Sequence, residues 1–89
     1  MKKFFKQKNI LITGHTGFKG SWLSLMLLYM QSNVYGYSLK PKKLSLFNAL
    51  NLNSKLKGNK FSDIRDYKQL EKFILKTKPD IIFHLAAQP

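Results

Sequence analysis

Apolar and polar residues follow one another along the chain in blocks that predict strands and helices in turn. Residues 9–13 form a short, continuous apolar run, which is typical of a strand buried on both faces of a parallel sheet. Residues 18–30 carry apolar side chains on nearly every face of a helix, so we expect a largely buried helix there. The main stripe of this helix consists of Trp22, Leu25, Met26 and Tyr29.

The middle of the chain repeats this pattern more weakly. Residues 34–38 predict a second strand, and the leucines of residues 44–52 indicate a short helix. Residues 55–60 read as a turn around a glycine, and residues 61–62 as a very short third strand. The middle therefore supplies a second and a third strand joined by a helical connection.

A third helix and a fourth strand complete the pattern. Asp66 and Gln69 have the spacing of a capping box, which predicts a helix start, and Pro79 predicts its end. Residues 80–87 form an apolar strand that runs into small residues. Strands and helices thus alternate along the whole chain.

This alternation predicts an α/β fold with a Rossmann-type parallel sheet in the order 3-2-1-4. In that order the second and third strands lie on one side of the first strand, and the fourth strand lies on its other side. The carboxyl ends of the first and fourth strands, at residues 13–14 and 85–86, should therefore flank one crevice. Ligands bind at such switch points in open parallel sheets.

Composition narrows the class of protein. The chain has 89 residues, which fit one small domain or part of a larger one. A hydrophobic content of 44% and a charged content of 22% are typical of folded proteins and argue against disorder. Because there is no cysteine, the chain has no disulfide framework and no thiolate metal site, and we predict no metal.

The net charge of +12 raises the question of nucleic acid or membranes as partners. Only Arg65 is an arginine, and the lysines are scattered from Lys2 to Lys78, so we expect no nucleic acid. The dense apolar run of residues 22–30 is far shorter than the roughly 20 residues of a membrane span, so we expect no membrane either. The charge favours phosphate-bearing ligands.

Three glycines after the first strand carry the strongest chemical signal. A predicted strand ends just before Gly14, and a predicted helix begins between Gly17 and Gly20. This is the setting of a dinucleotide-binding loop. Gly14 would permit the tight turn, Gly17 the approach of a pyrophosphate, and Gly20 close helix packing. Thr16 adds a hydroxyl and Lys19 a positive charge. The candidate cofactor-binding residues here are Gly14, Thr16, Gly17, Phe18, Lys19 and Gly20.

The end of the second strand lacks the acidic residue that usually binds the ribose of NAD. We expect the hydroxyl of Ser38 or that of Tyr37 to take its place, although Tyr37 also fits plain strand packing. Lys40 would instead favour a 2′-phosphate, so NADP stays open beside NAD.

The third and fourth strands add the remaining candidates. Asp63 follows the third strand, where its carboxylate would accept a hydrogen bond from an adenine amino group while Ile64 packs on the ring; the alternative is a turn or capping aspartate. We expect His84 to be a hydrogen-bonded core residue. At the end of the fourth strand, small side chains leave room for a flat cofactor, and the candidates there are Leu85, Ala86 and Ala87.

With these residues placed, the chain resembles the extended short-chain dehydrogenase/reductase family, and within it the CDP-glucose 4,6-dehydratases. The most specific part is the run Gly-His-Thr-Gly-Phe-Lys-Gly-Ser-Trp-Leu at residues 14–23. Further matching stretches are residues 36–39, 45–47, 63–66 and 84–89. Sister nucleotide-sugar dehydratases and epimerases share the fold and are the alternatives.

The resemblance implies an activity for the full-length protein. In the family, NAD takes a hydride from C4 of the activated glucose, water is lost across C5 and C6, and the hydride returns to C6. The resemblance therefore implies NAD as cofactor, CDP-glucose as substrate, and a cytoplasmic homo-oligomer in polysaccharide biosynthesis. By matching position, the three glycines would hold the pyrophosphate, Asp63 and Ile64 would meet the adenine, and Ala86 and Ala87 would line the cofactor path.

The chain departs from the family in one large respect. The family's catalytic Tyr-x-x-x-Lys pair has no counterpart, because none of the four tyrosines is followed by lysine four residues later. We therefore expect residues 1–89 to be the amino-terminal part of a dinucleotide-binding domain, the incomplete half of a doubly wound sheet, with no catalytic residue. A stand-alone nucleotide-binding module and a basic nucleic-acid-binding protein are the other hypotheses.

Overall fold

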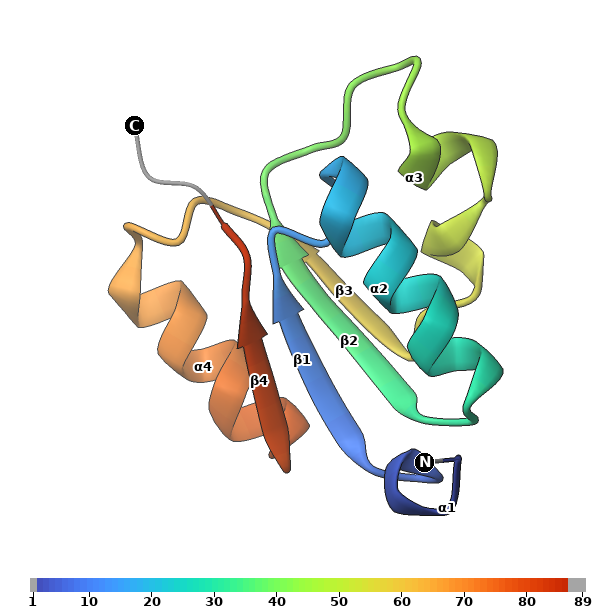
Figure 1. The fold of residues 1–89 in the computed structure, drawn as a ribbon. Helices are drawn as coiled ribbons and strands as arrows, with labels where there is room; N and C mark the ends of the chain where they lie inside the picture. The colour runs from blue at the N-terminus through green and yellow to red at the C-terminus, as the bar shows by residue number, and fades with distance from the viewer. Residues whose placement is uncertain (1, 87–89) are drawn as a thin grey trace.

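The predicted alternation of strands and helices is present in the computed structural model, which describes residues 2–86 (Figure 1). A four-residue helix, α1, precedes the first strand and was not predicted. The elements in chain order are α1 (Lys2–Phe5), β1 (Asn9–Thr13), α2 (Phe18–Tyr29), β2 (Asn33–Ser38), α3 (Leu46–Ala49), the 3-10 helix η1 (Leu52–Ser54), β3 (Gly58–Phe61), α4 (Tyr67–Thr77) and β4 (Ile81–His84).

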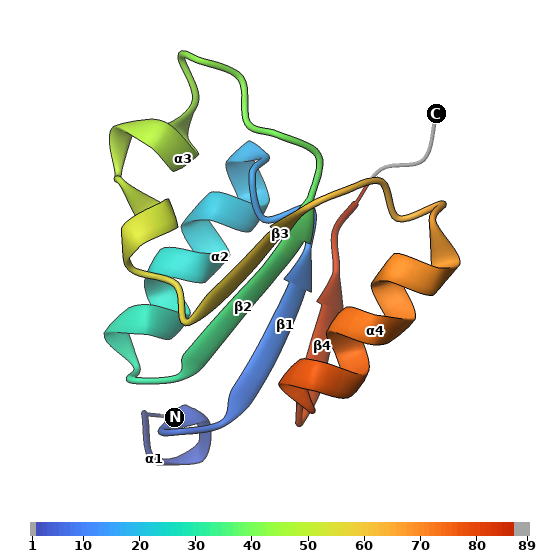
Figure 2. The same cartoon turned by 180° about the vertical axis from the view of Figure 1, so that it is seen from behind.

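The four strands form one parallel sheet in the order β3-β2-β1-β4, which confirms the predicted topology. β1 lies in the middle, where Ile10 pairs with Val34 of β2 on one side and with Ile81 of β4 on the other. Figures 1 and 2 show α2 and α3 on one side of the sheet and α4 on the other. The carboxyl ends of β1 and β4 therefore lie next to each other, as a switch point requires.

The core is centred on β1. Ile10, Leu11 and Ile12 are fully buried, because β1 has a neighbouring strand on each edge and helices over both faces. This double cover explains why the strand is a continuous apolar run rather than an alternating one. The other fully or almost fully buried apolar side chains are Leu27, Val34, Tyr37, Phe47 and Leu52.

The prediction that α2 is largely buried is wrong for its main stripe. Trp22, Met26 and Tyr29 are 46%, 53% and 73% exposed and lie on the outer face of the helix. The buried face instead carries small residues, Gly20, Ser21 and Ser24, together with Leu27. Small side chains let the helix axis approach the sheet closely, and both serine hydroxyls are satisfied by backbone carbonyls, Ser21 by His15 and Ser24 by Gly20.

Local hydrogen bonds define the helix ends. After α2, Gln31 adopts a left-handed conformation with φ of 64°, and the amides of Gln31 and Ser32 donate to Leu28 and Leu27 in a Schellman motif. Asp66 caps α4 by accepting from the Gln69 amide at 3.3 Å, as predicted. The reciprocal half of the capping box is replaced by a bond from the Asp66 amide to Asp63 O.

The third strand begins earlier than predicted. Gly58 and Asn59, which the sequence placed in a turn, pair with Tyr35 and Gly36 of β2, so β3 covers residues 58–61. The predicted helix over residues 44–52 is divided into α3 and η1 by Asn51, which has a left-handed φ of 52°. β4 is limited to residues 81–84. Within residues 2–86, no helix has the length and apolar character needed to cross a membrane.

Candidate functional site

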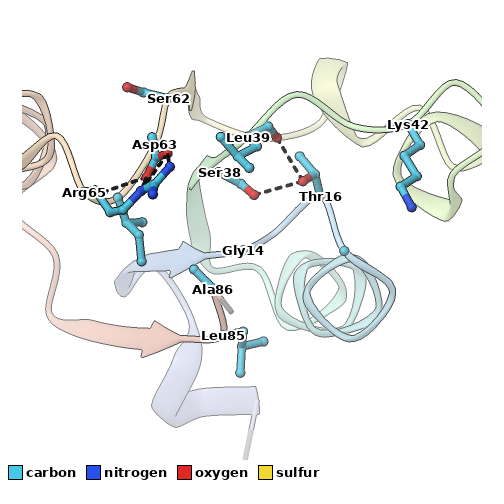
Figure 3. Close-up of a pocket in the computed structure, with 12 residues that line it drawn as sticks. Gly14, Thr16, Ser38, Leu39, Lys42, Ser62, Asp63, Arg65, Leu85 and Ala86 are labelled. Carbon is cyan, nitrogen blue, oxygen red and sulfur yellow. Dashed lines mark hydrogen bonds and ion pairs between the residues drawn. The ribbon is translucent and has the colours of Figure 1, made fainter. Parts of the chain in front are cut away.

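A cavity of about 490 Å³ lies at the carboxyl ends of the strands, beside the adjoining ends of β1 and β4 (Figure 3). Its walls come from the loop after β1, the ends of β2 and β3, and the end of β4. The described residues that line it are Gly14, Thr16, Gly17, Ser38, Leu39, Lys42, Ser62, Asp63, Ile64, Arg65, Leu85 and Ala86. The structure thus gathers residues from both ends of the chain around one space.

Gly14 forms the tight turn at the floor of the cavity. Its φ is +81°, a conformation that residues with a side chain rarely adopt, and its amide donates to Tyr37 O at 2.9 Å. A Cβ at this position would lie 2.7 Å from the backbone nitrogen of Ala86. The ends of β1 and β4 can therefore approach each other only because Gly14 has no side chain.

Gly17 and Gly20 play different structural parts in the same loop. A Cβ on Gly20 would collide with the backbone of Gly14 and His15, so this glycine allows α2 to pack against the loop. A Cβ on Gly17 would meet only Gly14 O, at 3.5 Å, which is an ordinary contact. Gly17 lines the cavity and is the N-cap of α2, so the amides of the first turn have no side-chain cap from it.

Two hydroxyl groups lie side by side at the end of β2. Thr16 Oγ1 is 2.9 Å from Ser38 Oγ and donates to Leu39 O at 3.0 Å (Figure 3). Because the Thr16 proton goes to Leu39, the proton between the two hydroxyls must come from Ser38. Both hydroxyl protons are then used inside the protein, and the oxygens have lone pairs left to accept hydrogen bonds.

Asp63 and Arg65 form an ion pair at the end of β3. Arg65 Nη2 lies 2.6 Å from Asp63 Oδ2, and the Arg65 backbone amide donates to Asp63 Oδ1 at 2.9 Å. The hydrogen bonds from the Arg65 side chain, followed by that from its amide, lower the pKa of Asp63 to about 2. Asp63 is therefore both a turn residue and a cavity-lining carboxylate that stays ionised at neutral pH.

The sequence did not predict four of the lining residues, which are Leu39, Lys42, Ser62 and Arg65. Lys42 belongs to the loop after β2, and Figure 3 shows it on the other side of Thr16 from the Asp63–Arg65 pair. A signal was present for Arg65, since it lies two residues after Asp63. Lys42 had none, because nothing in the sequence distinguishes it from the neighbouring Lys40 and Lys43.

Other candidates lie away from this cavity. Phe18 is 69% exposed and lines a smaller neighbouring cavity together with Lys40. Lys19 is exposed on the first turn of α2 and is not among the described lining residues. The Tyr37 ring is fully buried, 5.6 Å from the Phe73 ring, which supports plain packing rather than a ribose contact. Ala87 lies outside the described residues.

His84 has a hydrogen-bond partner but is not a core residue. Its Nδ1 lies 2.6 Å from Thr13 Oγ1, and its side chain is exposed on the outer strand of the sheet. Thr13 is 3% exposed and ends β1, and His84 ends β4. Their hydrogen bond therefore joins the carboxyl ends of these two strands. The expected hydrogen bond is present, and the expected burial is not, because β4 has no neighbouring strand on its second edge within residues 2–86.

The model of the GDP-mannose 4,6 dehydratase family matches residues 11–89. The curated CDP-glucose 4,6-dehydratase of Salmonella typhimurium is 48% identical over 89 residues, which are 99% of this chain and 24% of that protein. The chain thus spans about a quarter of the length of this relative.

Two solved structures share the fold. An epimerase from the methanogen Methanothermobacter thermautotrophicus superimposes with a TM-score of 0.72 and 25% identity, over 98% of this chain and 25% of that one. A protein from Burkholderia cenocepacia J2315 gives a TM-score of 0.70 and 22% identity, over 94% of this chain and 26% of the other. The second likeness shows the fold alone.

Proposed function

Because the chain belongs to the GDP-mannose 4,6 dehydratase family, we propose that residues 1–89 are the cofactor-binding segment of a nucleotide-sugar 4,6-dehydratase. We propose CDP-glucose as its substrate, since the Salmonella relative that carries this name is similar over the whole segment. The observation that carries the proposal is the glycine-floored cavity at the switch point of the sheet. Nucleotide cofactors bind at this place in parallel sheets.

The residues present fit a dinucleotide. A Cβ on Gly17 would meet only Gly14 O, and Gly17 lines the cavity, so a pyrophosphate can approach the backbone there. The uncapped amides and the positive dipole end of α2 are directed to the same place, and they stabilise anionic oxygens. Lys42 adds a positive charge to the wall. The glycine loop therefore supplies donors where the ligand has acceptors.

The hydroxyl pair favours NAD over NADP. Thr16 and Ser38 have no proton left to donate, since one is bound to Leu39 O and the other lies between them. Their free lone pairs accept hydrogen bonds from the 2′- and 3′-hydroxyls of a ribose. A 2′-phosphate brings only acceptors and would face these lone pairs without a donor. We therefore expect Ser38 and Thr16 to replace the usual carboxylate.

The adenine end is formed after β3. Asp63 accepts hydrogen bonds and is held in place by Arg65, so it can receive the adenine amino group without first being oriented. Ile64 and Leu85 offer apolar surface to the flat adenine ring. The side chain of Ala86 is small enough to leave room for the cofactor where it passes the end of β4. The lining thus changes from amide donors at the loop to a carboxylate at the end of β3.

When bound, NAD supplies a hydride acceptor that returns the same hydride, so the loss of water needs no outside oxidant. The residues of this segment bind and orient that cofactor. The substrate pocket and the groups that move protons on the sugar belong, in this proposal, to other parts of the full-length protein.

The test is to incubate the full-length protein with CDP-glucose, GDP-mannose or UDP-glucose and to analyse the products by mass spectrometry. We expect a mass decrease of one water for CDP-glucose. An unchanged mass with an inverted sugar hydroxyl would show an epimerase instead, and no turnover combined with NAD binding would favour a non-catalytic nucleotide-binding module. Calorimetry with NAD and NADP tests the cofactor, and tighter binding of NADP would assign Lys42 to a 2′-phosphate.

A further inference from the structure

His15 lies in the glycine loop, yet its side chain takes no part in lining the cavity. The ring is fully buried. It stands edge-to-face with Phe47 at 5.2 Å and stacks on Phe61 at 6.2 Å. The proposed function gives this buried polar ring no role.

The ring reaches across a whole strand. A Cβ on Gly36 of β2 would collide with the His15 ring, so the imidazole lies directly on β2 where no side chain is present. Beyond it, His15 Nε2 lies 2.6 Å from Oδ1 of Asn59, the residue of β3 that pairs with Gly36. His15 thus connects the loop after β1 with β3, although β2 separates these strands.

The hydrogen bonds have one consistent direction. Asn59 donates its amide protons to Asn53 Oδ1 of η1, so its own Oδ1 faces His15 and accepts from Nε2. Burial lowers the pKa of His15 to about 4, which leaves the ring neutral at pH 7. Among the described residues, Nδ1 makes no hydrogen bond of ordinary geometry. The backbone of Tyr37 raises the His15 pKa less than Asn59 does, so the bond from Nε2 to Asn59 is the main polar contact of the ring.

β3 continues directly into Ser62 and Asp63 at the far end of the cavity. The bridge from His15 to Asn59 therefore joins the two walls that a dinucleotide must contact together. Packing alone would need no polar atom here, because the ring's other neighbours, Phe47, Phe61 and Gly36, present apolar surface to it. The hydrogen bond adds a fixed length and direction.

We propose that His15 is a positioning residue that sets the distance between the glycine loop and the end of β3 through its hydrogen bond to Asn59. The inference rests on the proposed function, because the distance matters for a ligand that spans both walls. A ligand that contacts one wall alone does not depend on it. This difference separates positioning from a general contribution to stability.

The experiment uses the full-length protein with three substitutions. Asn59→Leu removes the acceptor, Asn59→Asp keeps an acceptor at the same place, and Phe47→Leu weakens the packing of the ring while leaving its hydrogen bond. Calorimetry measures the affinity for NAD, which spans both walls, and for adenine, which lacks the ribose and reaches the β3 wall alone. Thermal melts show whether each variant folds.

For Asn59→Leu we expect the Kd for NAD to rise about tenfold, as for the loss of one buried hydrogen bond, while the Kd for adenine stays at the wild-type value. Asn59→Asp and Phe47→Leu should keep wild-type affinity for NAD. An unchanged Kd for NAD in Asn59→Leu, or an equal loss for NAD and adenine, would overturn the proposal. If Asn59→Leu does not fold, Asn59→Ser takes its place with the same expectations.

A readout without ligand keeps the two proposals distinguishable. The Gly17 amide donates to Gly14 O at 3.2 Å within the loop, so its hydrogen exchange reports how firmly the loop is held. We expect faster exchange at Gly17 in Asn59→Leu than in Phe47→Leu. If the wild-type protein does not bind NAD, the proposed function fails, and equal exchange in these two variants would then refute the role of His15 as well.

Discussion

Replacing Gly17 by valine should separate binding from folding. The backbone at Gly17 has φ of −76° and ψ of 172°, an extended conformation that valine adopts readily. The new Cβ would meet only Gly14 O, at 3.5 Å. The fold therefore has room for the Cβ, and because Gly17 is exposed and lines the cavity, the methyl groups of valine would extend into the cavity.

The expected loss follows from the hydrogen bonds that the side chain would prevent. A pyrophosphate pushed away from the start of α2 loses contact with at least two backbone amides. Hydrogen bonds to a charged group contribute about 1.5–3 kcal/mol each, so the loss is at least about 3 kcal/mol. We therefore expect the Kd for NAD to rise by about 100-fold or more.

The assay is calorimetry with NAD together with thermal melts, on the full-length protein. Gly20→Ala is the matched control, because its Cβ would collide with Gly14 O and lie 2.7 Å from His15 Cα. Overpacking of this kind costs about 1–3 kcal/mol of stability, so this variant should melt earlier. Unchanged affinity in Gly17→Val would remove Gly17 from the phosphate site, and a melting temperature as low as that of Gly20→Ala would refute the steric reasoning.

The titration of His15, the hydroxyl pair of Thr16 and Ser38, and the unpaired edge of β4 each lead to a further testable expectation. The pKa of His15 is about 4 in the folded protein and about 6.5 in the unfolded chain, so the unfolded state takes up the proton first. The contribution of His15 to the free energy of unfolding is therefore fully present above pH 6.5 and falls by about 3 kcal/mol towards pH 4. Urea melts at pH 7 and 4.5 should show this fall in the wild type and a smaller one in His15→Phe, and equal falls would contradict it. Thr16→Val removes one acceptor of the hydroxyl pair and should weaken NAD binding about tenfold while leaving NADP binding unchanged, and calorimetry that showed an equal loss for both would argue against a ribose contact. The 89-residue chain expressed alone should show no dehydratase turnover and should self-associate, because the second edge of β4 is unpaired within the described part and Ile82 is 48% exposed. A monodisperse monomer in sedimentation, with slow amide exchange across β4, would refute the second part of this prediction.

Periodicity was sufficient for the order of the sheet but not for the orientation of α2. Its apolar residues surround the helix, so the sequence has no polar face to mark the outside. The inner face is decided by close approach to the Gly14 loop, which only Gly20, Ser21 and Ser24 allow. Size, rather than hydrophobicity, selects which side of this helix is buried, and a hydrophobic pattern does not measure size.

The glycine loop was predictable because its chemistry is local. Gly14 and Gly17 act through their own backbone, so strand, loop and helix in sequence are enough to locate them. The bond between Thr16 and Ser38 and the bridge from His15 to Asn59 depend on the register of separate strands. Register is set by the whole sheet, which a reading along the chain does not supply.

The pairing of β1 with β4 has a consequence for the time at which the cavity can form. Gly14 and Ala86 face each other across its floor, yet they are 72 positions apart, the difference between 86 and 14. A ribosome that adds about 5–20 residues per second needs roughly 4–15 s to synthesise that stretch. During this interval the glycine loop has emerged but its opposite wall has not, so no ligand can contact both. If the proposed function holds, loading of the cavity is therefore a late event in the synthesis of this segment, after β4 has left the ribosome.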